Sequence, residues 1–95
     1  MRSLLIWSVT RSRSHGSFED YLIAMAREAA GRGMAVEIAI GDELSDTVAS
    51  PLRDLGVTLH LMPVAALERA ETLAAHLEKN PVDLLHAHFV APDMR

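Results

Sequence analysis

The amino-acid sequence predicts an α/β domain with a parallel sheet of four strands in the order 3-2-1-4 and helices flanking it. Four apolar runs are short and nearly continuous, as is typical of strands buried on both faces; they lie at residues 4–9, 34–40, 57–61 and 82–87. Longer segments between them carry apolar residues at helical spacing, at residues 18–32 and 64–79. Strands and helices therefore alternate, and right-handed crossovers then favour a Rossmann-like sheet in this order.

The first long helix has recognisable signals at both ends. A polar, basic loop at residues 10–16 leads into it from the first strand. Ser17 is the expected N-cap, and Asp20 three residues later completes a capping box. Gly31 and Gly33 end the helix, because glycine adopts the left-handed conformation beyond a helix at little steric cost.

Proline and glycine divide the second half of the chain. After a polar connector, Ser50 is the expected N-cap of a short helix that begins at Pro51 and ends at Leu55. The second long helix stops before Pro81, which cannot continue it. The fourth strand follows, and residues 88–95 are expected to leave it.

The composition fits one globular domain over residues 1–95 and restricts its partners. Hydrophobic residues make up 49% and charged residues 23%, which excludes a disordered chain. The net charge of −4 argues against nucleic acid and anionic membranes as partners, because both favour basic surfaces. No apolar run is long enough to span a bilayer. Because cysteine is absent, disulfides are excluded, and we expect a cytoplasmic protein.

The predicted sheet order brings two polar clusters together. Between strands 1 and 4 the chain reverses direction across the sheet, and open α/β sheets bind ligands outside the carboxyl ends of such strands. The crevice would be lined by Arg11, Arg13, His15, Gly16 and Ser17 on one side and by His86 and His88 on the other. The topology therefore makes one candidate site from two distant clusters.

The loop after the first strand has features that suit an anion. Gly16 lets the backbone approach a ligand, and the helix start offers unpaired N–H groups. Arg11 and Arg13 could add charge-assisted hydrogen bonds to a phosphate. Against this, Glu19 and Asp20 place two carboxylates in the first turn, where they would repel a phosphate. A solvated loop without a ligand therefore stays an open interpretation.

The histidines allow structural and functional interpretations. His86 and His88 are two residues apart on a strand and therefore point to the same side, as in the H-x-H pair that begins some metal sites. Such a site needs further ligands from later strands, which this sequence lacks, so a strand-end histidine bonded to the backbone is the simpler interpretation. Glu37 is expected to face a gap between helices, and His60 and His76 are expected to be ordinary strand and helix residues. We therefore predict no metal site and no cofactor.

Three segments together resemble a known family. They are G-x-F-E-x-Y-L with A-R-E and G-R-G-M-A-V-E-I, then L-x-x-L-G-V, then P-V-D-L-L-H-A-H-F. In order and spacing they resemble the start of family 4-type glycosyltransferases, which are two-domain GT-B enzymes that transfer a sugar from a nucleotide donor with retention of configuration. The family usually has Gly-Gly where this chain has His15-Gly16.

The resemblance implies a role for individual residues. Gly16 would belong to the loop that faces the interdomain cleft, and His88 would match the histidine beside the donor sugar. The chain would be the acceptor-side, amino-terminal part of an enzyme of carbohydrate biosynthesis, an incomplete half of a GT-B fold without the nucleotide-sugar domain. By itself it would be inactive. His86, within the apolar run, is expected to be more buried and structural, and His88 to be the functional residue.

Two other functions compete with a glycosyltransferase segment. One is a free-standing, flavodoxin-like module that binds a small anion in the same crevice. The other is a fragment of a metal-dependent hydrolase built around His86 and His88. Titration with nucleotide sugars and with metal ions distinguishes the three.

Overall fold

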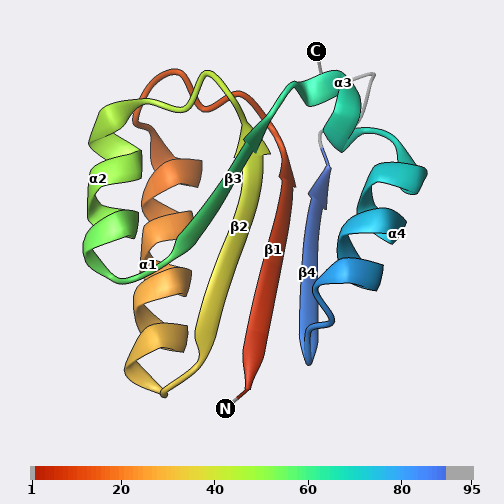
Figure 1. Ribbon diagram of the computed structural model, residues 1–95. Helices are drawn as coiled ribbons and strands as arrows, with labels where there is room; N and C mark the ends of the chain where they lie inside the picture. Colours follow the sequence, from red (N-terminus) through yellow and green to blue (C-terminus); the bar gives the residue numbers. More distant parts are fainter. Residues whose placement is uncertain (1, 90–95) are drawn as a thin grey trace.

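A parallel sheet of four strands lies between two layers of helices (Figure 1). The computed structural model describes residues 2–89. The strands are β1 (Ser3–Val9), β2 (Ala35–Gly41), β3 (Thr58–Met62) and β4 (Leu84–Phe89). The helices are α1 (Ser17–Gly31), α2 (Asp46–Asp54), α3 (Val64–Leu67) and α4 (Ala70–Lys79). The sheet order is β3-β2-β1-β4 with every pair parallel, which confirms the predicted fold.

The two faces of the sheet carry separate halves of the core. Strand alternation sends Ile6 and its neighbour Ile38 to the face covered by α1 and α2. It sends Trp7 and its neighbour Ala39 to the face covered by α3 and α4. Figure 1 shows the two helical layers on opposite sides of the strands. All four residues are almost fully buried. Burial on both faces explains why the central strands are continuous apolar runs in the sequence.

The start of α1 differs from the prediction. Gly16 is the N-cap and Ser17 is already helical. The carboxylate that returns to the N-cap belongs to Glu19, whose Oε1 accepts from the Gly16 N–H at 2.9 Å, and not to Asp20. The reason is positional, because Glu19 is the third residue of the helix when Gly16 is its cap. At the other end, Gly33 has a φ of +80°, as predicted for a glycine stop.

Helix α2 begins five residues earlier than predicted. Its N-cap is Ser45, which accepts from the Thr47 N–H at 3.3 Å, so Ser50 is not a cap and Pro51 lies inside the helix. A proline there removes one backbone hydrogen bond. The longer helix compensates by burying three apolar side chains, those of Val48, Ala49 and Leu52.

The predicted helix over residues 64–79 is two helices. The chain is extended at Arg69, which separates α3 from α4. The break lets Leu67 become fully buried, and its carbonyl oxygen accepts a hydrogen bond from Trp7 Nε1 at 2.9 Å. A continuous helix would have used that carbonyl for its own backbone bonding. Tertiary contact with Trp7 therefore accompanies the break.

Strand β4 is shifted by two residues from the prediction of residues 82–87. Asp83 lies before the strand, where its carboxylate accepts from the Ser3 N–H at 2.8 Å and its N–H donates to Ser3 Oγ at 3.2 Å. This exchange holds Asp83 at the start of β1, and pairing begins at Leu84. The exit predicted over residues 88–95 is therefore wrong at His88, which still belongs to the strand, and residues 90–95 lie outside the described residues.

Candidate functional site

The carboxyl ends of β1 and β4 bring His88 to the start of α1. Ser8 and His88 are paired in the sheet and lie on the face covered by α1. The His88 ring stacks on Phe18, with ring centroids 4.4 Å apart and an interplanar angle of 22°. Ser8 Oγ is buried and has no hydrogen-bond partner within residues 2–89. The chain reverses direction across the sheet between β1 and β4, and we call the carboxyl ends of these strands the switch point. The switch point thus combines an imidazole, stacked on an aromatic ring, with a nearby hydroxyl.

His86 and His88 point to the same side of β4, as predicted. His86 pairs with Ile6 and His88 with Ser8, both on the α1 face of β1. Both histidines are partly buried, so the expectation that His86 is the more buried of the two stays a prediction. What distinguishes them is their position along the strand and the stacking of the His88 ring on Phe18 in the first turn of α1.

The basic loop is hydrogen-bonded to the end of β2 and to the segment that follows it. The Gly41 N–H donates to the Thr10 carbonyl at 2.8 Å, and the Ser45 N–H donates to the Ser12 carbonyl at 2.9 Å. Gly41 is required here, since a Cβ at this position would lie 2.6 Å from the Thr10 oxygen. Ser12 is buried and has a φ of +51°, an uncommon conformation for a residue other than glycine. The loop therefore has a defined shape.

Arg11 and Arg13 are directed to the β2 side of this loop. Their Nε atoms lie 3.3 Å and 2.6 Å from the Glu43 carboxylate. All three side chains are largely exposed, and exposed ion pairs contribute at most about 1 kcal/mol. The structure therefore places these arginines beside Glu43 and not beside His88, although an anionic ligand could separate them from Glu43 at small cost.

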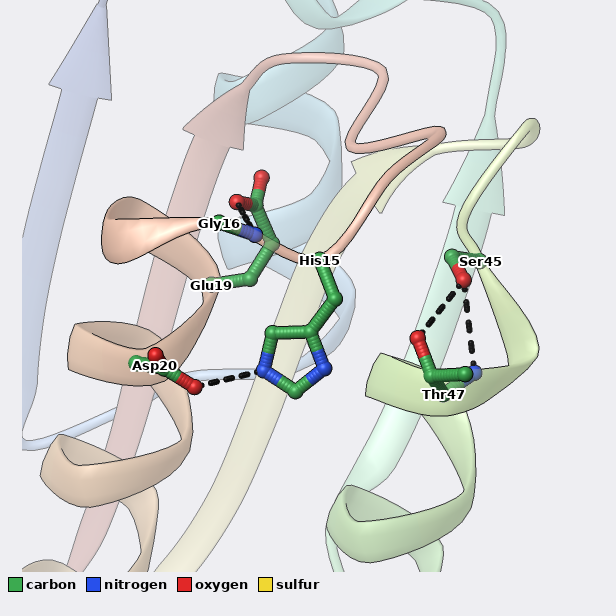
Figure 2. Close-up of polar contacts among 6 residues, drawn as sticks. All are labelled: His15, Gly16, Glu19, Asp20, Ser45 and Thr47. Atoms are coloured by element: carbon green, nitrogen blue, oxygen red, sulfur yellow. Dashed lines mark hydrogen bonds and ion pairs between the residues drawn. The ribbon is translucent and has the colours of Figure 1, made fainter.

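Glu19 occupies the amino terminus of α1 (Figure 2). Burial raises the pKa of its carboxyl group, but the nearby Ser12 hydroxyl and the hydrogen bond from the Gly16 N–H have the opposite effect. Together with the Glu19 N–H and the charge of His15, they hold the pKa below its ordinary value of 4.5. One of the N–H groups at this helix start, that of Gly16, is thus already bonded to a carboxylate.

His15 also has a hydrogen-bonding partner within the chain. Its Nε2 lies 2.6 Å from the carboxylate of Asp20, one turn into α1, as Figure 2 shows. Asp20 is exposed, so solvent screens this pair. Ser17 is exposed at the start of the helix. The start of α1 therefore carries two carboxylates that already have partners within the chain, and these would repel a free phosphate.

Sequence reasoning missed a second polar cluster on the opposite face of the sheet. Glu37 on β2, His60 on β3 and His76 on α4 place one carboxylate oxygen and two ring nitrogens within 4.8 Å of one another. We expected Glu37 to face a gap and the histidines to be ordinary. A polar residue in the middle of each of two adjacent strands was the available signal, but the register that joins them came only with the structure.

A small hollow lies at the break between α3 and α4. Its volume is about 140 Å³, below the roughly 300 Å³ of the smallest typical ligand pockets. It is lined by Trp7, Leu67, Glu68, Arg69, Ala70 and Leu73. It belongs to the α4 face and is separate from the contact between His88 and Phe18.

Comparison with known proteins adds no relative, because no family model and no curated protein matches the chain. Within residues 2–89, no helix has the length and apolar character needed to cross a membrane.

Proposed function

We propose that the chain is the acceptor-side, amino-terminal segment of a retaining glycosyltransferase, which transfers a sugar from a nucleotide-sugar donor to an acceptor. The observation that carries the proposal is the contact between His88 and Phe18 at the switch point of the sheet. Open α/β sheets bind ligands at this position. The resemblance of three sequence segments to family 4-type glycosyltransferases supports the choice of a sugar as ligand.

In this proposal His88 contacts the transferred sugar. Its ring nitrogens can donate to a sugar hydroxyl or to an oxygen of the leaving phosphate, and stacking on Phe18 fixes the plane of the ring. Glu19 already accepts from Gly16, so the main phosphate contacts would come from the nucleotide-binding domain of the enzyme.

That domain would lie outside the 95 residues, and we expect the chain by itself to show no transfer. A cleft with one wall cannot orient donor against acceptor, and orientation supplies a large part of the rate enhancement in group transfer. The proposal retains a cytoplasmic location, which a chain without cysteine allows.

The decisive experiment compares two histidine variants in the full-length enzyme. We expect His88→Ala to lower transfer about 100-fold, the effect of losing one donor to developing charge, with little change in melting temperature. His86→Ala is the matched control, because His86 lies on the same face of β4 two residues before His88, and it should lower stability more than transfer. Wild-type turnover in His88→Ala would contradict the assignment.

Further measurements separate the alternatives. The coding sequence beyond the codon for Arg95 should contain a second domain, and an immediate stop codon would contradict the proposal. A small-anion module would bind inorganic phosphate tightly without any sugar, and the Glu19 carboxylate at the α1 start disfavours this. An H-x-H hydrolase would bind metal through His86 and His88.

A further inference from the structure

We propose that Glu37, His60 and His76 form a binding site for a divalent transition-metal ion of the zinc type. Each residue comes from a different element, β2, β3 and α4. Glu37 Oε1 lies 2.7 Å from His60 Nε2 and 3.6 Å from His76 Nε2. The histidine rings meet edge to face, with centroids 4.7 Å apart. Three ligand-type atoms thus converge on one point between the sheet and α4.

The spacing of these atoms is close to what zinc requires. Zn–N and Zn–O distances of about 2.1 Å place two ligands of a tetrahedral ion about 3.4 Å apart. The contact between Glu37 and His76 already has nearly this length. The contact between Glu37 and His60 would have to open by about 0.7 Å, which small side-chain rotations achieve. The backbone can therefore stay where it is.

The cluster has an unsatisfied nitrogen that a metal would use. His76 Nε2 is buried and has no hydrogen-bond partner among the described residues. Its side chain is 11% exposed, and 3.6 Å from Glu37 is too long for a hydrogen bond whichever tautomer is present. A buried polar atom without a partner is unfavourable, and a metal ion removes that cost by accepting the nitrogen lone pair.

The ligand set defines the class of metal. Two imidazoles and a carboxylate, without thiolates, suit Zn²⁺ and the neighbouring first-row ions, and three protein ligands leave a fourth position for water. The short contact between Glu37 and His60 requires a proton between the two atoms. The metal would take the place of this proton, which moves to the other ring nitrogen or to solvent.

The metal would fasten α4 to the sheet. No residue of α4 is fully buried, so this helix depends on partly buried contacts. Ligands from β2 and β3 together with His76 would join the helix to two strands at once. The site lies on the face opposite His88, and so it does not depend on the proposed glycosyltransferase function.

Trp7 provides a direct assay. It is the only tryptophan in the chain, it is fully buried, and its ring centroid lies 5.7 Å from that of His76. We expect Co²⁺ to quench its fluorescence with a stoichiometry of one ion per chain, and Zn²⁺ to compete. Calorimetry with Zn²⁺ gives the affinity, and bound Zn²⁺ should raise the melting temperature.

Variants identify the ligands. His76→Gln should weaken Zn²⁺ binding at least tenfold and abolish the quenching. The matched control replaces both His86 and His88 with glutamine, which removes the other close histidine pair and should change the affinity less than twofold. If His76→Gln melts at much lower temperature without metal, His60→Gln, at a more exposed ligand, replaces it and should show the same loss.

Two results would overturn the assignment. One is the absence of saturable binding of Zn²⁺ or Co²⁺ to the folded chain. The other is binding that survives the loss of His60 and His76 but disappears when His86 and His88 are replaced, which would place the metal at the H-x-H pair on the other face.

Discussion

Neutralising Glu19 should destabilise the chain in a way that depends on pH. Glu19 is 9% exposed, and its carboxylate accepts from the Gly16 N–H at the positive end of the α1 dipole. Glu19→Gln keeps an acceptor oxygen but removes the charge, whose interaction with a helix end contributes about 0.5 to 1 kcal/mol. Glu19→Ala also removes the capping bond, and its total cost should be about 2 kcal/mol. For a domain of this size, each kcal/mol lowers the melting temperature by about 4–8 °C.

The sign of the pH effect follows from the lowered pKa of Glu19. A carboxyl group with a folded-state pKa below its unfolded value of 4.5 stabilises the fold fully above that value. The contribution is lost as the pH falls through the folded-state pKa, because the proton then binds to both states. The difference in melting temperature between wild type and Glu19→Gln should therefore be present at pH 7 and shrink toward pH 3.

Thermal unfolding followed by circular dichroism between pH 7 and pH 3 measures this difference. Glu28→Gln is the matched control, because Glu28 lies on the same helix in an exposed pair with Arg32. Its effect should stay below about 0.5 kcal/mol. An equal loss of stability for Glu19→Gln at both ends of the pH range would refute the argument, since it would show that the charge of Glu19 has no part in the capping interaction.

Two further substitutions test the packing around the sites. Gly41→Ala should lower the free energy of unfolding by about 3 kcal/mol in chemical denaturation, because its Cβ would lie within 3 Å of the Thr10 and Arg11 backbone. Gly31→Ala, with open space at its Cβ, should instead be neutral or stabilise by about 0.5 kcal/mol, and equal effects at both glycines would contradict the close approach. Trp7→Phe should cost about 1–3 kcal/mol because it leaves the buried Leu67 carbonyl without its donor, and an unchanged denaturation midpoint would show that this hydrogen bond contributes nothing.

The sheet could be predicted from the sequence because its elements are separated by strong local signals. Glycine after α1 and proline before β4 bound apolar runs of clear length, and the handedness of crossovers then leaves few possible orders. Local signals were less reliable where two of them competed. Ser45 and Ser50 are both acceptable N-caps, and Ser50 is followed by a favourable proline, but only a start at Ser45 buries a full apolar stripe.

In the candidate sites, too, the sequence predicted some contacts between distant residues and missed others. The contact of His88 with the start of α1 follows from strand order alone, and it was predictable. The directions of Arg11 and Arg13 were not, because Glu43 lies in a connector whose position no sequence pattern defines. Glu37 and His60 meet only because β2 pairs with β3 in one register, and a shift by one residue would send them to opposite faces.

The alternation of β1 separates the two proposed sites. Ser8 faces α1 and the His88 crevice, whereas its neighbour Trp7 faces α4 and contacts His76. A metal at His76 can therefore alter the surroundings of Trp7 without touching any group in the crevice. Coupling between the sites would have to pass through the backbone of β1, which is buried and paired on both sides. Such a strand has little freedom to move, so metal binding should leave the proposed transfer at His88 unchanged while it stabilises α4.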